Sequence, residues 1–201
     1  MIRRLVDKGS EIIRKYHLYA FKDVVIFMAI LIIFHLLWKL FVRDVLAVGF
    51  IRDSANWLAE FVYMQSRWIL DGITSQVTAF DEMTINGRNH KNVFFHAPNI
   101  GYVYVNQSCS GLKQFYQWFF LMILYPGPWR HKIWFIPLGL VVIHFVNILR
   151  VLGMVAVTMH LPEHWDFMHD YIMRPFFYVV MFGLWVWWNE KYYLKSRQVR
   201  S

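Results

Sequence analysis

The sequence contains a single cysteine, Cys109, in 201 residues, so no disulfide can form within the chain. Acidic residues are also few, with 13 Asp and Glu against 21 Lys and Arg and a net charge of +8. A cleavable signal peptide is not expected, because the amino-terminal basic region is long and no small-x-small cleavage site follows the first apolar block. We expect that block to stay as a membrane anchor.

Apolar residues are abundant and concentrated. They make up 58% of the chain, and aromatic residues alone make up 19%, whereas a soluble domain is nearer half apolar. Because they form long blocks, the sequence predicts membrane spans within about one domain. The basic residues flank these blocks, so their charge indicates topology and not a nucleic-acid partner. They include Arg3, Arg4, Lys8, Arg14, Lys15, Lys22, Arg130, Lys132, Lys191, Lys195, Arg197 and Arg200.

The amino-terminal half divides into four segments. Residues 1–22 alternate basic and apolar groups and predict a cytoplasmic amphipathic segment, and residues 24–42 predict the first span. Residues 44–80 carry charges too closely spaced for a span, so we expect one or two amphipathic helices on the outer surface or, alternatively, a re-entrant hairpin. Residues 81–108, with an Asn86-Gly87 turn, predict a small extracytoplasmic β element that leads into the cysteine.

The carboxy-terminal half, residues 109–188, predicts three further spans. They cover 112–125, 133–160 and 171–188, with a polar loop at 161–170 and a basic cytoplasmic tail at 189–201. The expected fold is an all-α integral membrane bundle of about four spanning helices, with amphipathic surface helices and the β element outside. Both termini are then cytoplasmic, and the cysteine faces the extracytoplasmic side of the cell membrane.

Cys109 lies where the last predicted strand meets a span. Asn106 or Ser108 could cap the helix that begins there, and a helix amino terminus favours the thiolate, which is the nucleophilic form. The amides of Ser110 and Gly111 could receive a developing oxyanion. The alternative is a buried cysteine that serves as a small apolar group, but the polar neighbours argue against simple apolar packing.

Arg150 is the more informative residue, because it lies inside an uninterrupted apolar span. At about 1.5 Å per residue it is roughly 25 Å from Ile133, near the outer leaflet. A charge at membrane depth costs roughly 2.5–3.5 kcal/mol and usually marks a functional site. Asn147 lies one turn earlier on the same face. Snorkelling to the headgroups is the alternative, and we favour an inward-facing guanidinium.

Histidines follow in the outer loop and could supply a general base, because imidazole titrates near neutrality. His169 begins the last predicted span at the height of Cys109, and Arg174 follows a little over one turn later. His160 and His164 flank Pro162 and remain open as substitutes. His35 and His144 are expected to be hydrogen-bonded within the bundle, and His131 to be cytoplasmic.

These motifs resemble the exosortase and archaeosortase family of multispanning membrane cysteine enzymes. The resemblance rests on Cys109-Ser110-Gly111 at the outer entrance of a span, Asn147-x-x-Arg150 late in the next span and His169 at the start of the last. It covers roughly residues 100–185, in a chain shorter than the larger members.

The resemblance implies a transpeptidase or protease (a thiol protease or transferase) that recognises a carboxy-terminal sorting signal on secreted proteins, made of a short motif, an apolar helix and a basic end. It implies that Cys109 forms an acyl-enzyme, that His169 transfers the proton and that Arg150 stabilises charge, with no cofactor or metal. We expect Asn106, Ser110, Gly111, Asn147 and Arg174 to contact the substrate. Membrane lipids are the other expected partner.

Two other functions remain open. His160, His164, His169, Glu163 and Asp166 could ligate a metal, but Pro162 argues against the continuous helix that would align them. The chain could also be a non-catalytic membrane subunit or binding partner, in which Cys109 is unreactive. Transport is disfavoured, since the spans show no internal repeat.

Overall fold

The computed structural model describes residues 18–96 and 101–194. Most of the predicted amphipathic segment, residues 1–17, and the end of the basic tail, residues 195–201, therefore lie outside the described residues. The main helices are α2 (Leu18–Ala47), α3 (Gly49–Ile73), α4 (Leu112–Leu124), α5 (Trp129–His160) and α7 (Arg174–Trp188).

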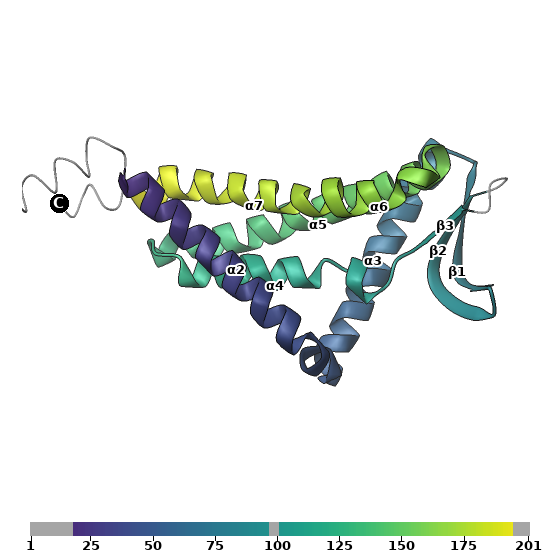
Figure 1. Ribbon diagram of the computed structural model, residues 1–201, viewed down its shortest axis with the longest axis horizontal. Coiled ribbons are helices and arrows are strands. Elements are labelled where there is room, and N and C mark those ends of the chain that lie inside the picture. The colour runs from purple at the N-terminus through teal and green to yellow at the C-terminus, as the bar shows by residue number, and fades with distance from the viewer. Residues whose placement is uncertain (1–17, 97–100, 195–201) are drawn as a thin grey trace, which may run out of the picture.

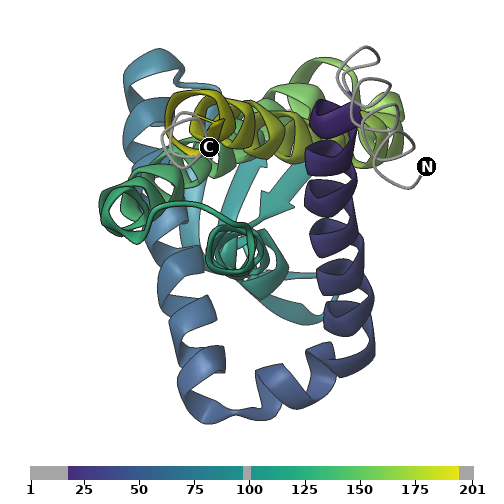
Figure 2. The same cartoon turned by 90° about the vertical axis from the view of Figure 1, so that its left-hand side faces the viewer.

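The long helices form a bundle with the small sheet at one end (Figure 1). Along the bundle axis, α2 and α3 lie on opposite sides, with α4 between them (Figure 2). Helix α2 contacts α4, and α3 contacts α5. The carboxy-terminal end of α5 and the amino-terminal end of α4 both come to the end of the bundle that carries the sheet.

In the part of the chain that the structure describes, two helices are long and apolar enough to cross a membrane, namely α2 over Phe21–Phe41 and the whole of α5. The apolar side chains of α2 are mostly exposed, as expected for a surface that faces lipid; among them are Phe21, Val25, Met28, Ile32, Ile33, Leu36, Leu37, Leu40 and Phe41. The predicted membrane-helical fold with a small β element is confirmed at this level.

The region predicted as one or two amphipathic helices, residues 44–80, divides differently. Helix α2 continues to Ala47, and α3 is one helix of 25 residues. Its buried residues recur every three or four positions, from Ala55 to Leu70, so that one face packs on α5 and the sheet. The first strand then begins at Val77, four residues before the predicted β element.

The sheet is antiparallel with the order β1–β2–β3 and comprises β1 (Val77–Ile85), β2 (Arg88–His96) and β3 (Gly101–Tyr104). Asn86 and Gly87 both have positive φ, as a tight hairpin turn requires. Tyr63 on α3 donates a hydrogen bond to Asp81 on β1 at 3.3 Å. Burial and the Asp81 carboxylate raise the pKa of Tyr63 to about 12.

The predicted outer loop, residues 161–170, is largely helical. Two short turns, η2 (Pro162–His164) and α6 (Trp165–Phe167), lead into a π-helical segment η3 (Met168–Met173), which continues as α7. Pro175 explains the widened turn, since proline lacks the amide that an α-helix would use there and its ring crowds the carbonyl four residues earlier. A second π-helical segment, η4 (Asn189–Tyr193), follows α7.

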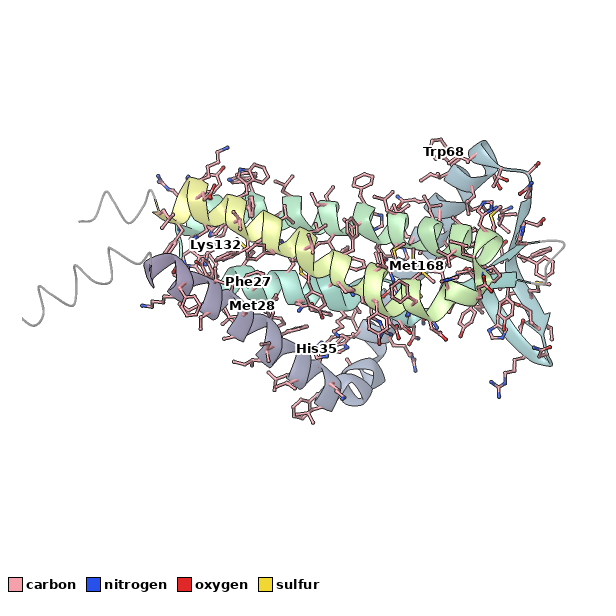
Figure 3. The ribbon with its side chains drawn as sticks, turned by 45° about the horizontal axis from the view of Figure 1, so that its top comes forward. Phe27, Met28, His35, Trp68, Lys132 and Met168 are labelled. Atoms are coloured by element: carbon pink, nitrogen blue, oxygen red, sulfur yellow. The ribbon has the colours of Figure 1, made fainter. Side chains whose placement is uncertain are left out.

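Lys132 lies at the end of the bundle away from the sheet, far from Met168 (Figure 3). Its ammonium is buried and donates to the carbonyls of Tyr125 at 2.6 Å and Ile123 at 3.4 Å. These carbonyls belong to the end of α4, where a cation is favoured. The basic Trp129–Lys132 turn thus lies at the end of the bundle opposite the sheet.

Helices α4 and α5 approach closely where Trp118 packs over Gly139. The indole of Trp118 is fully buried and donates to the carbonyl of Ile136 at 3.1 Å. A Cβ at position 139 would collide with the atoms of that indole. Glycine at this position therefore allows the helix contact.

We expect Gly139→Ala to destabilise the protein by about 1–3 kcal/mol, because the rigid indole cannot move aside in a packed core. Thermal unfolding of the purified protein in detergent measures the effect. Gly183→Ala is the matched control, since a Cβ there meets nothing within 4 Å and alanine is the better helix former. Equal melting temperatures for the two variants would contradict the proposed packing.

Candidate functional site

A cavity of about 840 Å³ opens at the end of the bundle next to the sheet. Cys109, Arg150 and His169 all line it, although they come from three different elements. Its wall also includes residues of α2, β3, α4 and α6–α7. The structure therefore brings the three residues that the sequence singled out to the same cavity.

Cys109 ends a short 3-10 turn, η1 (Gln107–Cys109), three residues before α4. The side chain of Asn106 caps this turn by accepting from the Ser108 amide at 3.0 Å. The Ser110 amide donates to the carbonyl of Gln107 at 3.3 Å. The thiol is thus carried by a tight turn before the helix, and one of the two predicted oxyanion donors already has a partner.

Asn147 holds the cysteine turn against α5. Its amide nitrogen donates to the carbonyl of Cys109 at 2.8 Å. Gly111 lies directly over this amide with φ at +82°, and a Cβ there would come within 3.0 Å of the Asn147 nitrogen. Ser110 is buried as well, and its hydroxyl donates to Gln107 at 2.7 Å. Ser110, Gly111 and Asn147 do not line the cavity. They therefore position the cysteine turn and do not form part of the cavity wall.

Arg150 is only 8% exposed although it carries a charge. One of its terminal nitrogens, Nη2, donates to Nε2 of His169 at 3.0 Å. Its Nε is buried and has no hydrogen-bond partner among the described residues. Cys109 lies within electrostatic range of the guanidinium. The side chain therefore points into the bundle, and part of its hydrogen-bonding capacity is left for a ligand.

His169 is held from both sides. Its Nδ1 lies 2.7 Å from Oδ1 of Asp170, and this carboxylate also pairs with Arg174 at 3.0 Å. Neighbouring side chains on an α-helix do not face each other, but these two lie in the π-helical segment η3, whose turn is wider. The indole of Trp165 stacks parallel to the imidazole. The ring is thereby fixed in orientation.

The other predicted histidines lie elsewhere. His160 and His164 are exposed and do not line the cavity. Within residues 18–96 and 101–194, no three His, Cys, Asp or Glu side chains come together as a metal would need. His144 bonds Gln65 at 2.6 Å within the bundle, as predicted. Arg174 and Asn106 do line the cavity.

Several residues in or next to the site were not predicted from the sequence. Asp170 does not line the cavity but bonds His169, which does. Its place directly after His169 was the available signal, but its role depends on the π-helical turn. Lys113 on α4 donates to Nδ1 of His35 at 3.2 Å, and Tyr178 on α7 lies 3.5 Å from the same nitrogen. His35, labelled in Figure 3, thus links α2 to α4 and α7, and all three residues line the cavity. No local sequence pattern links these residues.

The fold and site define a helical membrane protein in which a half-buried thiol, a buried guanidinium and an oriented imidazole line one cavity. Comparison with known families agrees: the model of the transmembrane exosortase family matches residues 20–186. The chain belongs to this family, a family of membrane transpeptidases or proteases. The match reaches back to α2, beyond the residues 100–185 on which the resemblance rested. No curated protein and no solved structure matches the chain.

We expect Gly111→Ala to slow modification of Cys109 by thiol reagents, because the new Cβ meets Asn147 and a left-handed conformation costs a non-glycine residue about 1–2 kcal/mol. Mass spectrometry of timed alkylation measures the rate. Gly49→Ala is the control, since the space around that glycine is empty and its φ is ordinary. If Gly111→Ala labels at the same rate as Gly49→Ala, Asn147 does not position the cysteine.

Proposed function

We propose that the protein is a membrane cysteine transpeptidase or peptidase that cleaves carboxy-terminal sorting signals of secreted proteins. The observation that carries the proposal is the shared cavity of Cys109, Arg150 and His169, in which His169 is bonded on both sides. A nucleophile, a base and an orienting carboxylate are the parts that such chemistry needs. Family membership supports the reaction class.

The contacts of His169 assign its two nitrogens. Since Asp170 accepts a hydrogen bond from Nδ1–H, the neutral ring carries its lone pair on Nε2. That lone pair accepts from Arg150 in the resting site. Nε2 is therefore the nitrogen that takes the thiol proton, once the guanidinium turns toward the sulfur. Arg150 then faces the thiolate that it favours.

The reaction proceeds in two halves. The Cys109 thiolate attacks the scissile carbonyl, and Arg150 stabilises the tetrahedral oxyanion. His169 gives its proton to the leaving amine, the carbon–nitrogen bond breaks, and a thioester remains on Cys109. An acceptor amine, a lipid or sugar carrier, or water then attacks the thioester, and the carbon–sulfur bond breaks. His169 takes the proton that the acceptor loses and returns it to the sulfur.

In the topology that we propose, this cavity lies at the extracytoplasmic surface of the cell membrane. Helices α4 and α7 join α2 and α5 as spans, and both termini face the cytoplasm. The basic Trp129–Lys132 turn then lies inside, at the end opposite the sheet, in agreement with the preference of Lys and Arg for that side. The substrate presents its motif at the outer surface, while its apolar helix packs beside the bundle in the lipid.

We expect Cys109→Ala and Arg150→Ala to abolish processing while the protein still accumulates in membranes. Arg150→Lys should fail as well, because one ammonium cannot replace the fork of the guanidinium. The measurement is quantitative mass spectrometry of secreted proteins that keep their carboxy-terminal apolar segment. Undiminished processing in Cys109→Ala cells would end the thiol mechanism.

An independent test follows the thiol itself. In intact cells, a membrane-impermeant thiol reagent should label Cys109, and it should do so more slowly in Arg150→Ala and His169→Ala. Labelling only in inverted vesicles would overturn the topology. Absence of activated labelling from either side would favour a non-catalytic subunit.

We expect Asp170→Asn to lower the processing rate between about tenfold and 10⁴-fold, because His169 loses the acceptor that fixes its tautomer. The matched control is Asp166→Asn, four residues earlier on the same surface and without a hydrogen bond or ion pair among the described residues. Both are measured by single-turnover acylation of Cys109. Equal rates for the two variants would remove Asp170 from the mechanism.

A further inference from the structure

The strand that precedes Cys109 forms an edge of the sheet. In the order β1–β2–β3, strand β3 pairs only with β2 among the described residues. Five consecutive residues, from Tyr102 to Asn106, border the cavity that contains Cys109. The cavity therefore runs along this edge strand and ends at the thiol.

The backbone groups on the open side of β3 can be assigned. The Val105 amide donates to the carbonyl of Asn92 on β2 at 3.0 Å. Because hydrogen-bonding groups alternate in direction along an antiparallel strand, those of Val103 also face β2, whereas those of Tyr102 and Tyr104 face away. The Val103 and Val105 side chains are buried in the cluster beneath the sheet. The open side thus presents two amides and two carbonyls to the cavity.

An open strand edge in a cavity is a site for an extended peptide, since main-chain groups without a partner are a template for another strand. The chain direction adds a further constraint. Strand β3 runs toward η1, and α4 then continues away from the sheet into the bundle (Figure 1). The substrate signal proposed above has the same order, with its motif at the outer surface followed by an apolar helix in the membrane. The two chains would therefore run in the same direction.

We propose that the motif-bearing segment of the substrate adds to the sheet as a fourth strand, parallel to β3 and bonded to the backbone of Tyr102 and Tyr104. This inference rests on the proposed function. The segment on the amino-terminal side of the scissile bond lies along β3, and its carbonyl carbon arrives at Cys109. Main-chain bonds supply the affinity, and the side chains of the motif point alternately to the two faces of the new strand.

The test uses two thiol-reactive probes on the purified full-length protein in detergent, acetyl-tetraalanine vinyl sulfone and methyl vinyl sulfone. In both, the Cys109 sulfur adds to the double-bond carbon farther from the sulfone, and the carbon beside the sulfone takes up the proton. Tetraalanine offers backbone bonds without side-chain specificity. Each rate is divided by the rate of the same probe with a small free thiol, because the two double bonds differ in intrinsic reactivity. We expect this relative rate to be higher for the peptide probe by about fivefold for each hydrogen bond formed, the factor that corresponds to a net contribution near 1 kcal/mol.

Backbone changes on both partners separate strand pairing from other contacts. N-methylation of alternate amides of the probe should slow labelling about fivefold each, whereas N-methylation of the amides between them should change it little. In the protein, Tyr104→Pro removes an amide on the open side only, which an edge strand tolerates. Tyr104→Ala is the control that loses the side chain and keeps the amide.

The outcomes are distinct. A peptide advantage that Tyr104→Pro removes and Tyr104→Ala retains supports the proposal. Equal relative rates for the two probes on a reactive Cys109, or an effect of N-methylation that does not alternate, would overturn it and leave the proposed function intact. No reaction with either probe would instead count against the catalytic thiol. If Tyr104→Pro also loses reaction with methyl vinyl sulfone, it has misfolded, and the N-methylated probes on the unmodified protein decide.

Discussion

The buried guanidinium of Arg150 is the constraint around which the site is arranged. A cation among apolar helices is stable only if its donors find partners, and the partner here is the neutral nitrogen of His169 and not a carboxylate. Asp170 is linked to the arginine through the imidazole. Among the described residues, no salt bridge joins the guanidinium to a carboxylate, so its positive charge is not neutralised directly. Negative charge placed beside the guanidinium in the cavity would therefore be stabilised.

The residues of the site form two groups, one that lines the cavity and one that positions the cysteine turn. Cys109, Arg150 and His169 form the first group and line the cavity. Asn147 and Gly111 form the second group, in which one hydrogen bond and one close contact fix the path of the chain before α4. Helix α5 carries one residue of each group, and Asn147 lies one turn before Arg150. The same rigid helix therefore positions both the cysteine backbone and the guanidinium.

The sequence alone could predict those features that local chemistry determines. A cysteine with polar neighbours before an apolar block, an arginine within a span and a histidine at the next membrane boundary are each unusual in their setting, so Cys109, Arg150 and His169 could be selected. The π-helical turn could not be predicted, because it depends on how Pro175 is accommodated within a packed helix. Asp170 was missed for the same reason. The contact of His35 with Lys113 joins residues 78 positions apart and arises only from packing.

The π-helical segment η3 sets the rotation of His169 about the axis of the last helix. It amounts to about one residue more than α-helical geometry would place in that length, and one residue corresponds to roughly 100° of rotation about the axis. The part of the chain that carries His169 is consequently turned relative to α7, whose apolar surface packs in the bundle. Substitutions that adjust α7 to its surroundings can thus accumulate without changing the direction in which the imidazole points.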